Sequence, residues 1–259
     1  MQNNNMSYTR KLTVCAMLVA VAIVINYFRI AVPIGGAPVL NIAFGGPFIK
    51  FAGLLFGPIY GGAAGAAVDL AVHFSNPQGA YIWELTLVEF IKGATIAFLF
   101  YTGKRIRFSI FNGIYIAVCA IALVWGAANF AALAAFPESG YALLLGSIGR
   151  RSDYISIGLI AAGLVGLVPY IILRLATARR SPDFFEQFCR LLPAVGLPCL
   201  VLTVVNTFVL RRYGIFTSVP FMAICIPRVI EEFIMVLFNV YLLSILIKVY
   251  GYAFKRNVG

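Results

Sequence analysis

The sequence predicts an all-α integral membrane protein with about eight transmembrane helices and both termini in the cytoplasm. First, 62% of the 259 residues are hydrophobic and only 11% are charged. Second, the apolar runs approach the length of about 20 residues that a spanning helix needs. Third, Lys and Arg gather in short connecting segments, as they do in cytoplasmic loops. Nothing remains for a soluble domain, so residues 1–259 are expected to form a single transmembrane domain of a multi-pass protein in the cell membrane.

Composition also limits the partners and cofactors. The net charge of +11 comes largely from loop residues of the topology-determining kind, so we expect lipid around the protein and no nucleic acid partner. The five cysteines form no Cys-x-x-Cys pair, and neither a disulfide nor a metal site is expected. The chain lacks the G-x-x-x-x-G-K-S/T, G-x-S-x-G and H-E-x-x-H patterns. We therefore expect no cofactor, no ATP binding by this chain and no enzymatic activity.

The first predicted helix follows Arg10 and Lys11, a basic pair that indicates a cytoplasmic N-terminus. Small residues at 20–22 resemble a signal-peptide cleavage site, but the apolar run continues to Ile30, which favours an uncleaved helix over about 12–32. Prolines and glycines deny residues 33–38 a helix start. We expect irregular backbone there, at an extracellular rim that forms part of a lid over a ligand.

Two helices then meet at the turn Gly-Pro-Ile-Tyr-Gly-Gly of residues 57–62. Gly53, Gly57, Gly61 and Gly65 recur at every fourth position around this turn. This spacing places small residues on one helical face and lets neighbouring backbones approach closely in lipid.

The remaining segments follow the same alternation of apolar runs and basic ends. Basic residues at 104–107, 179–180 and 255–256 join the N-terminal pair, so the charge rule is satisfied at four inner sites of an eight-helix topology. A short amphipathic piece at the inner surface is expected over 181–190. The predicted spans cover about 12–32, 40–56, 62–74, 82–101, 108–136, 154–176, 191–210 and 223–250.

Several motifs occur in a fixed order within the first half of the chain. The turn at 57–62 is followed by G-x-x-x-D at Gly65 to Asp69, and then by Asn-Pro-Gln-Gly-Ala-Tyr at 76–81. This pattern resembles the substrate-binding S components of energy-coupling factor (ECF) vitamin transporters, most closely the folate-type branch. The resemblance covers about 12–104 and returns at 191–250. After Tyr81 the chain departs from the folate-type pattern, which leaves the vitamin open.

The resemblance implies a six-helix core, formed here by residues 1–104 and 191–250, with 108–180 as an inserted helical hairpin. It also implies capture of a vitamin at the outer face, most readily folate or a related flat anionic micronutrient. The implied partners are a transmembrane T subunit and two ATPase subunits. Two alternatives stay open: an ion-coupled secondary transporter that uses Asp69, Glu84 or Glu89, and a membrane enzyme that acts on a lipid.

The inserted hairpin shares one spacing with the last two helices. Asn129 precedes Arg151 by twenty-two residues, as Asn206 precedes Arg228, and a leucine follows each Asn four positions later. Duplication and coincidence are both compatible with these matches.

The candidate ligand contacts lie at the predicted outer ends of the helices. Pro227-Arg228 after Asn206-Thr207 matches the folate-type pattern, and guanidinium groups bind carboxylates with two hydrogen bonds. An alternative is that Arg228 neutralises Glu231 or Glu232, which follow it by three and four residues. Aromatic side chains at the outer mouth are suited to stacking or to a membrane-surface belt. The predicted substrate-binding residues are Tyr81, Trp83, Glu84, Asn206, Arg211 and Arg228.

Other ionisable residues in apolar segments have structural explanations. Glu89 and Lys92 are three residues apart and are interpreted as a structural pair. Asp69 and His73 are one turn apart, which suits either a polar clasp between helices or a proton relay.

Ala16 and Ala20 form an A-x-x-x-A step in the first helix. The resemblance implies that this step packs on the T subunit, whereas the alternative is close packing within this chain.

Overall fold

The computed structural model describes residues 6–34, 37–77, 79–103, 108–135, 152–177, 182–214 and 221–255. Within these ranges the chain forms eight helices and one pair of strands. Five of these helices are long and apolar enough to cross a membrane. The elements are α1 (Tyr8–Tyr27), β1 (Ile30–Ile34), β2 (Ala37–Ile42), α2 (Gly46–Phe56), α3 (Pro58–Ser75), α4 (Trp83–Gly103), α5 (Phe108–Ala135), α7 (Ser152–Thr177), α8 (Pro182–Arg212) and α9 (Phe221–Lys255).

Local sequence explains several helix starts. The Ser7 side chain accepts a hydrogen bond from the backbone N–H of Arg10 and so caps α1. Pro47 and Pro58 occupy the first turns of α2 and α3, where a missing backbone N–H costs nothing. Gly57 joins these two helices at φ +111°, a conformation that favours glycine.

The strand pair corrects the prediction of an irregular loop at 33–38, while the other described elements are helices as predicted. β1 and β2 are antiparallel, with Ile30 opposite Ile42 and an irregular register between Val32 and Pro33. The flanking residues are rich in Ile and Val, which favour strands, and the irregularity accommodates a residue that lacks a ladder N–H. As a consequence, α1 ends at Tyr27 and not near residue 32.

The predicted amphipathic piece at 181–190 is not separate either. It forms the first turns of α8, which continues through Pro193 and Pro198 to Arg212. An ion pair between Glu186 and Arg190, 2.8 Å apart and four residues along the helix, joins these first turns. Local polarity was therefore a poor guide to where this helix begins.

The helices α2, α3 and α4 pack through the glycines that the sequence spaced by four. A Cβ on Gly61 would lie 2.6 Å from the carbonyl oxygen of Gly93, and one on Gly65 would lie 2.7 Å from the carbonyl oxygen of Glu89. A Cβ on Gly53 would lie 3.0 Å from the Cα of Gly61. The close backbone approach predicted for this spacing is confirmed.

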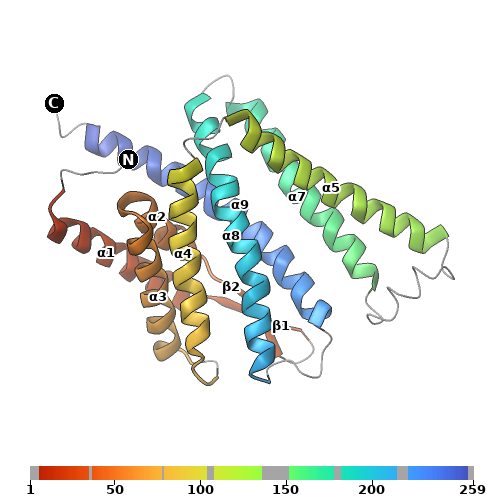
Figure 1. Cartoon of the computed structure of the whole chain (residues 1–259), viewed down its shortest axis with the longest axis horizontal. Coiled ribbons are helices and arrows are strands. Elements are labelled where there is room, and N and C mark those ends of the chain that lie inside the picture. The colour runs from red at the N-terminus through yellow and green to blue at the C-terminus, as the bar shows by residue number, and fades with distance from the viewer. Residues whose placement is uncertain are drawn as a thin grey trace.

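The two C-terminal helices pack on this group. α8 packs against α4 and α9, and α9 also contacts α2 and β2. α5 and α7 pair with each other and contact α8 and α9, so they lie on the far side of α8 from α3 and α4 (Figure 1). The start of α1 and the end of α9 lie toward the same side of the molecule. An apolar cluster fills the space between α2, α4, α8 and α9, with Leu54, Ile96, Leu191, Val195, Val240 and Leu243 among its members.

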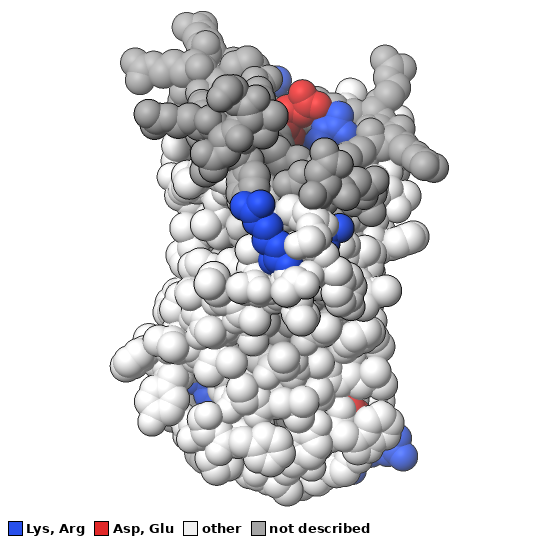
Figure 2. Space-filling view, turned by 90° about the vertical axis from the view of Figure 1, so that its left-hand side faces the viewer, with Lys and Arg blue, Asp and Glu red and all other residues white. Residues whose placement is uncertain are grey.

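The outer surface suits a bilayer. Figure 2 shows a face whose middle band is free of charged side chains, with Lys, Arg, Asp and Glu above and below it. Large apolar side chains such as Val24, Phe98 and Val124 are well exposed. Such a surface is stable only against lipid or another protein.

Candidate functional site

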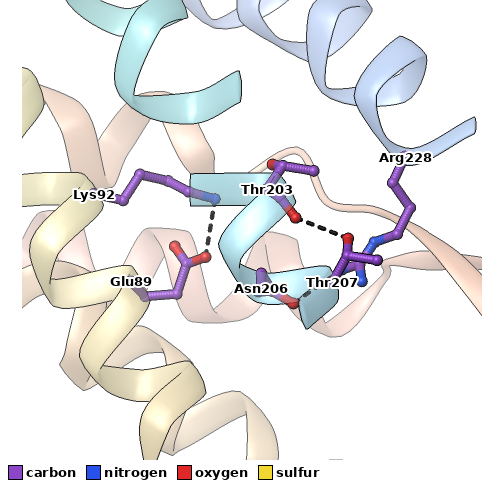
Figure 3. Close-up of polar contacts among 6 residues, drawn as sticks. All are labelled: Glu89, Lys92, Thr203, Asn206, Thr207 and Arg228. Carbon is purple, nitrogen blue, oxygen red and sulfur yellow. Dashed lines mark hydrogen bonds and ion pairs between the residues drawn. The ribbon is translucent and has the colours of Figure 1, made fainter. Parts of the chain in front are cut away.

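A buried group of polar side chains lies between α4, α8 and α9 (Figure 3). On α4, Lys92 Nζ and Glu89 Oε1 are 3.0 Å apart, with only 13% and 29% of the two side chains exposed. The ion pair predicted from their spacing is confirmed. A hydrogen-bonded pair of opposite charges is the form in which charges are tolerated at membrane depth.

Arg228 lies across from this pair, on α9. Its Nη2 donates a hydrogen bond of 3.1 Å to Asn206 Oδ1 on α8. Its Nη1 is buried and has no hydrogen-bond partner. The structure thus brings together the two residues predicted from the Asn-Thr and Pro-Arg motifs, and it leaves one guanidinium nitrogen available to an acceptor.

Glu232 connects these groups. It lies one turn after Arg228 and interacts electrostatically with Lys92 and Lys50, and Cys199 and Thr203 lie beside it. Thr203 in turn accepts a hydrogen bond of 2.8 Å from the Thr207 hydroxyl through its backbone carbonyl. Side chains from four helices, α2, α4, α8 and α9, therefore meet in one polar network.

Two buried polar side chains, of which Lys50 belongs to the network, were missed by the sequence analysis. Lys50 is only 8% exposed in α2, and Asn239 is buried in α9 with its Oδ1 unpartnered. The signal for Lys50 was a single cation inside the apolar run of α2. Asn239 has no such signal, because an isolated amide in an apolar helix also satisfies itself locally, as its Nδ2 does by donating to Met235 O.

The network contains as many acids as bases. Lys50, Lys92 and Arg228 contribute three positive charges. Glu89, Glu231 and Glu232 contribute three negative charges, and all three interact electrostatically with Arg228. In their usual ionised forms, these six side chains carry no net charge.

Glu84 occupies a different place, at the start of α4. Its Oε1 accepts a hydrogen bond from the Tyr213 hydroxyl, just beyond the end of α8, and its Oε2 is buried without a partner. Glu84 thus connects the ends of the two helices that hold the network.

The other predicted contacts lie apart from Arg228. Trp83 is largely exposed, and Tyr81 stacks on Phe74 at a centroid distance of 6.0 Å. The guanidinium of Arg211 lies 5.9 Å from the centre of the Phe221 ring. These three residues are placed around one end of the bundle and not inside the polar network.

Asp69 ties α3 to α4. Its Oδ2 accepts a hydrogen bond of 2.6 Å from the Thr86 hydroxyl, which also lies 2.9 Å from the Tyr81 hydroxyl. His73 packs against the rings of Phe74 and Tyr81. This arrangement agrees with a polar clasp between helices. Nearby, Arg29, which the sequence analysis did not single out, donates to the backbone carbonyl of Asn76 at 3.0 Å.

Ala16 and Ala20 lie on the exposed face of α1. Close packing within this chain therefore does not account for the A-x-x-x-A step. Within the described residues, no group of three or more His, Cys, Asp or Glu side chains has the arrangement of a metal site.

Comparison with known proteins gives two matches of different extent. The model of the family "ECF-type riboflavin transporter, S component" matches residues 6–167, more than half of the chain. "Folate transporter FolT" of Clostridium novyi (strain NT) is 35% identical over 69 residues, which are 27% of this chain and 40% of that protein. The match thus spans well under two thirds of that relative. No solved structure matches the chain.

The family match begins before α1 and ends within α7, so α8 and α9 lie outside it. It includes the glycine-packed helices, Asp69 and the Glu89–Lys92 pair. S components are the membrane subunits that bind the substrate for ECF importers, and they are not enzymes. The chain belongs to the family of ECF-type S components and is a multi-pass membrane protein.

Proposed function

We propose that this S component binds the heterocycle of its vitamin between α4, α8 and α9, with Arg228 as the main polar contact. The observation that carries the proposal is the buried, unpartnered Nη1 of Arg228. A buried donor without an acceptor is costly, and a hydrogen bond from a charged donor is about twice as strong as a neutral one. A carbonyl or carboxylate of the ligand would satisfy it.

The charge balance of the network favours an uncharged ligand. Its three bases already face three acids. The glutamate tail of folate would bring two more negative charges, for which the network has no spare cation. Riboflavin is uncharged and carries ring carbonyls suited to an arginine donor. We therefore rank riboflavin, named in the family description, above folate, which the partial relative and the sequence motifs favour.

Glu84 is proposed as a second contact, because its Oε2 is buried and lacks a donor. Tyr81, Trp83 and Arg211 are proposed to surround the entrance, where an exposed aromatic ring is available for stacking. This assignment places the α3–α4 connection on the extracellular side and both termini in the cytoplasm, in agreement with the basic residues near the chain ends.

Titration of the purified protein with riboflavin, followed by ligand fluorescence, and with folate, followed by calorimetry, tests the proposal. We expect saturable riboflavin binding that is at least tenfold tighter than folate binding. Tighter folate binding would reverse the ranking of the vitamins. Absence of binding by either compound to well-folded protein would contradict the proposed function.

Coupling to the importer is proposed to use the exposed face of α1. A bulky ring in Ala16→Trp or Ala20→Trp would prevent close approach of the T subunit, so transport should stop while ligand affinity stays within about twofold. Val124→Trp, on the exposed face of α5, is the matched control and should leave transport intact. Transport that depends on a proton or sodium gradient and not on ATP hydrolysis would favour the secondary transporter instead.

A further inference from the structure

Arg228 donates its hydrogen bond to a neutral amide, although carboxylates are available to it. Three acids, Glu89, Glu231 and Glu232, interact electrostatically with it. The last two follow it at the helical spacing at which Arg and Glu side chains meet. Nevertheless its Nη2 donates to Asn206, and its Nη1 has no partner. Other side chains must therefore hold at least part of the negative charge of these three carboxylates.

The two lysines account for two of the acids. Lys92 donates a hydrogen bond of 3.0 Å to Glu89 and also interacts electrostatically with Glu232. Lys50 approaches Glu232 from α2, and Cys199 and Thr203 complete the surroundings of that carboxylate. Figure 3 shows Lys92 and Glu89 extending from α4 toward the turn of α8 that holds Asn206, with Arg228 on the opposite side.

We propose that Lys92 is a positioning residue for ligand binding: it holds Glu89 and shares Glu232 with Lys50, and thereby leaves the Arg228 guanidinium open to the ligand. The inference rests on the proposed function, since it takes Arg228 as the ligand contact. Lys92 itself is not proposed to touch the vitamin.

The physical reason lies in the cost of an unpaired buried charge. Without the Lys92 ammonium, the half-buried Glu89 carboxylate would lose its hydrogen-bonded cation, which is unfavourable. Arg228 interacts electrostatically with Glu89 and is a cation that could turn toward it. A guanidinium bound to an internal carboxylate has to be released before it can donate to a ligand, so affinity falls.

The inference predicts a recovery that simple structural damage does not produce. Lys92→Met should weaken riboflavin binding by about tenfold, within the range found for coupled neighbouring residues. Lys92→Met combined with Glu89→Gln removes the competing acid as well and should return the affinity to within about threefold of the wild type. Lys92→Gln, which keeps a hydrogen-bond donor without charge, is a second variant should Lys92→Met fold poorly, and it should show the same loss.

A double-mutant cycle with Arg228→Ala tests whether the effect passes through Arg228. In the Arg228→Ala protein, Lys92→Met should change riboflavin affinity by less than about twofold, because there is no guanidinium left to capture. Folate, measured by calorimetry on the same variants, replaces riboflavin as the probe if the wild type prefers it. Melting temperature is recorded for every variant.

The possible outcomes distinguish a failure of this inference from a failure of the proposed function. Unchanged affinity with a lowered melting temperature in Lys92→Met would make Glu89–Lys92 a purely structural pair and overturn the inference. A loss that persists in the double variant, or in the Arg228→Ala background, would overturn it too. Both results leave the proposed function standing. Only a wild-type protein that binds neither vitamin would remove the proposed function and the inference together.

Discussion

Two long helical hairpins of this protein, α5–α7 and α8–α9, differ in what lies between their helices. α5 carries no charged side chain, and α7 carries only Asp153 and Arg174. Glycines hold these two helices together: a Cβ on Gly126 would lie 2.8 Å from the backbone nitrogen of Ile160. α9 instead places Arg228 and Glu232 against α8. Because close packing can join helices in a membrane, the charges of α8–α9 favour the functional role proposed for them.

The surroundings of the two hairpins reinforce this difference. α8 and α9 pack on α4 and α2, next to the Glu89–Lys92 pair, whereas α5 and α7 contact the outer sides of α8 and α9. The family match, however, includes α5 and most of α7 and leaves out α8 and α9. Sequence similarity and packing thus favour different hairpins as the last two core helices. The proposed duplication cannot be compared position by position, because Arg151 lies outside the described residues.

Loss of the buried guanidinium should have the largest effect on binding. Arg228→Ala is expected to cost about 2 to 5 kcal/mol of riboflavin affinity, because a desolvated charged donor is lost, and Arg228→Lys should recover only part of it. The control is Arg174→Ala, which removes an exposed arginine from α7 and should change affinity by less than twofold. If both variants bind equally well, the charge of α8–α9 has no role in the site. Fluorescence titration measures each affinity.

Glycine packing gives the next largest effect, on folding. Gly61→Leu would drive a side chain into the backbone of Gly93, which cannot rotate away, and should destabilise the protein by about 3 kcal/mol. Gly113→Leu is the matched variant in α5, since nothing lies within 4 Å of a Cβ there. Thermal unfolding in detergent compares the two. Equal melting temperatures would mean that the α3–α4 contact is looser than the structure indicates.

The smallest effect on affinity is expected from Asn206 in α8, and its comparison with Asn129 in α5 discriminates best between the two hairpins. Asn206→Ala removes the acceptor that orients Arg228 and should weaken riboflavin binding by about 1.5 kcal/mol, the lower range for a hydrogen bond to a charged group. Asn129→Ala removes a buried amide of α5 and should lower only the melting temperature. A loss of affinity in Asn129→Ala would show that the two hairpins share one site.

The sequence identified features that depend on short spacing. The Glu89–Lys92 pair, three residues apart, and the glycines spaced by four follow from helical geometry alone. Asn206 and Arg228 were found together through motifs, since no local rule joins residues twenty-two apart. The approach of Lys50 to Glu232 depends on how α2 packs on α9, which no local pattern encodes.

The errors have the same origin. Two prolines in β1 and β2 suggested a loop, but pairing between strands overrode that local signal. Charged residues before position 191 suggested a separate surface piece, but the Glu186–Arg190 pair lets the helix continue. Arg211 and Trp83, which the sequence analysis grouped with Arg228 because all three lie near helix ends, have other neighbours in the structure, and their contact with the ligand stays a prediction.

Removal of the α5–α7 hairpin tests whether α4, α8 and α9 form the ligand site. The carbonyl oxygen of Gly103 accepts a hydrogen bond from Arg190 Nη1 at 3.5 Å, so the end of α4 already lies beside the early turns of α8. Pro182 is about 12 Å from Arg190 along the helix. A Gly-Ser linker of about eight residues, with a reach of about 15 Å, can therefore replace residues 104–181.

Riboflavin affinity of this shortened protein is the decisive measurement. The account predicts binding within about fivefold of the full chain, and a further loss when Arg228→Ala is added. A shortened protein that is folded by thermal unfolding but no longer binds riboflavin would contradict the account, because the site would then require α5 and α7.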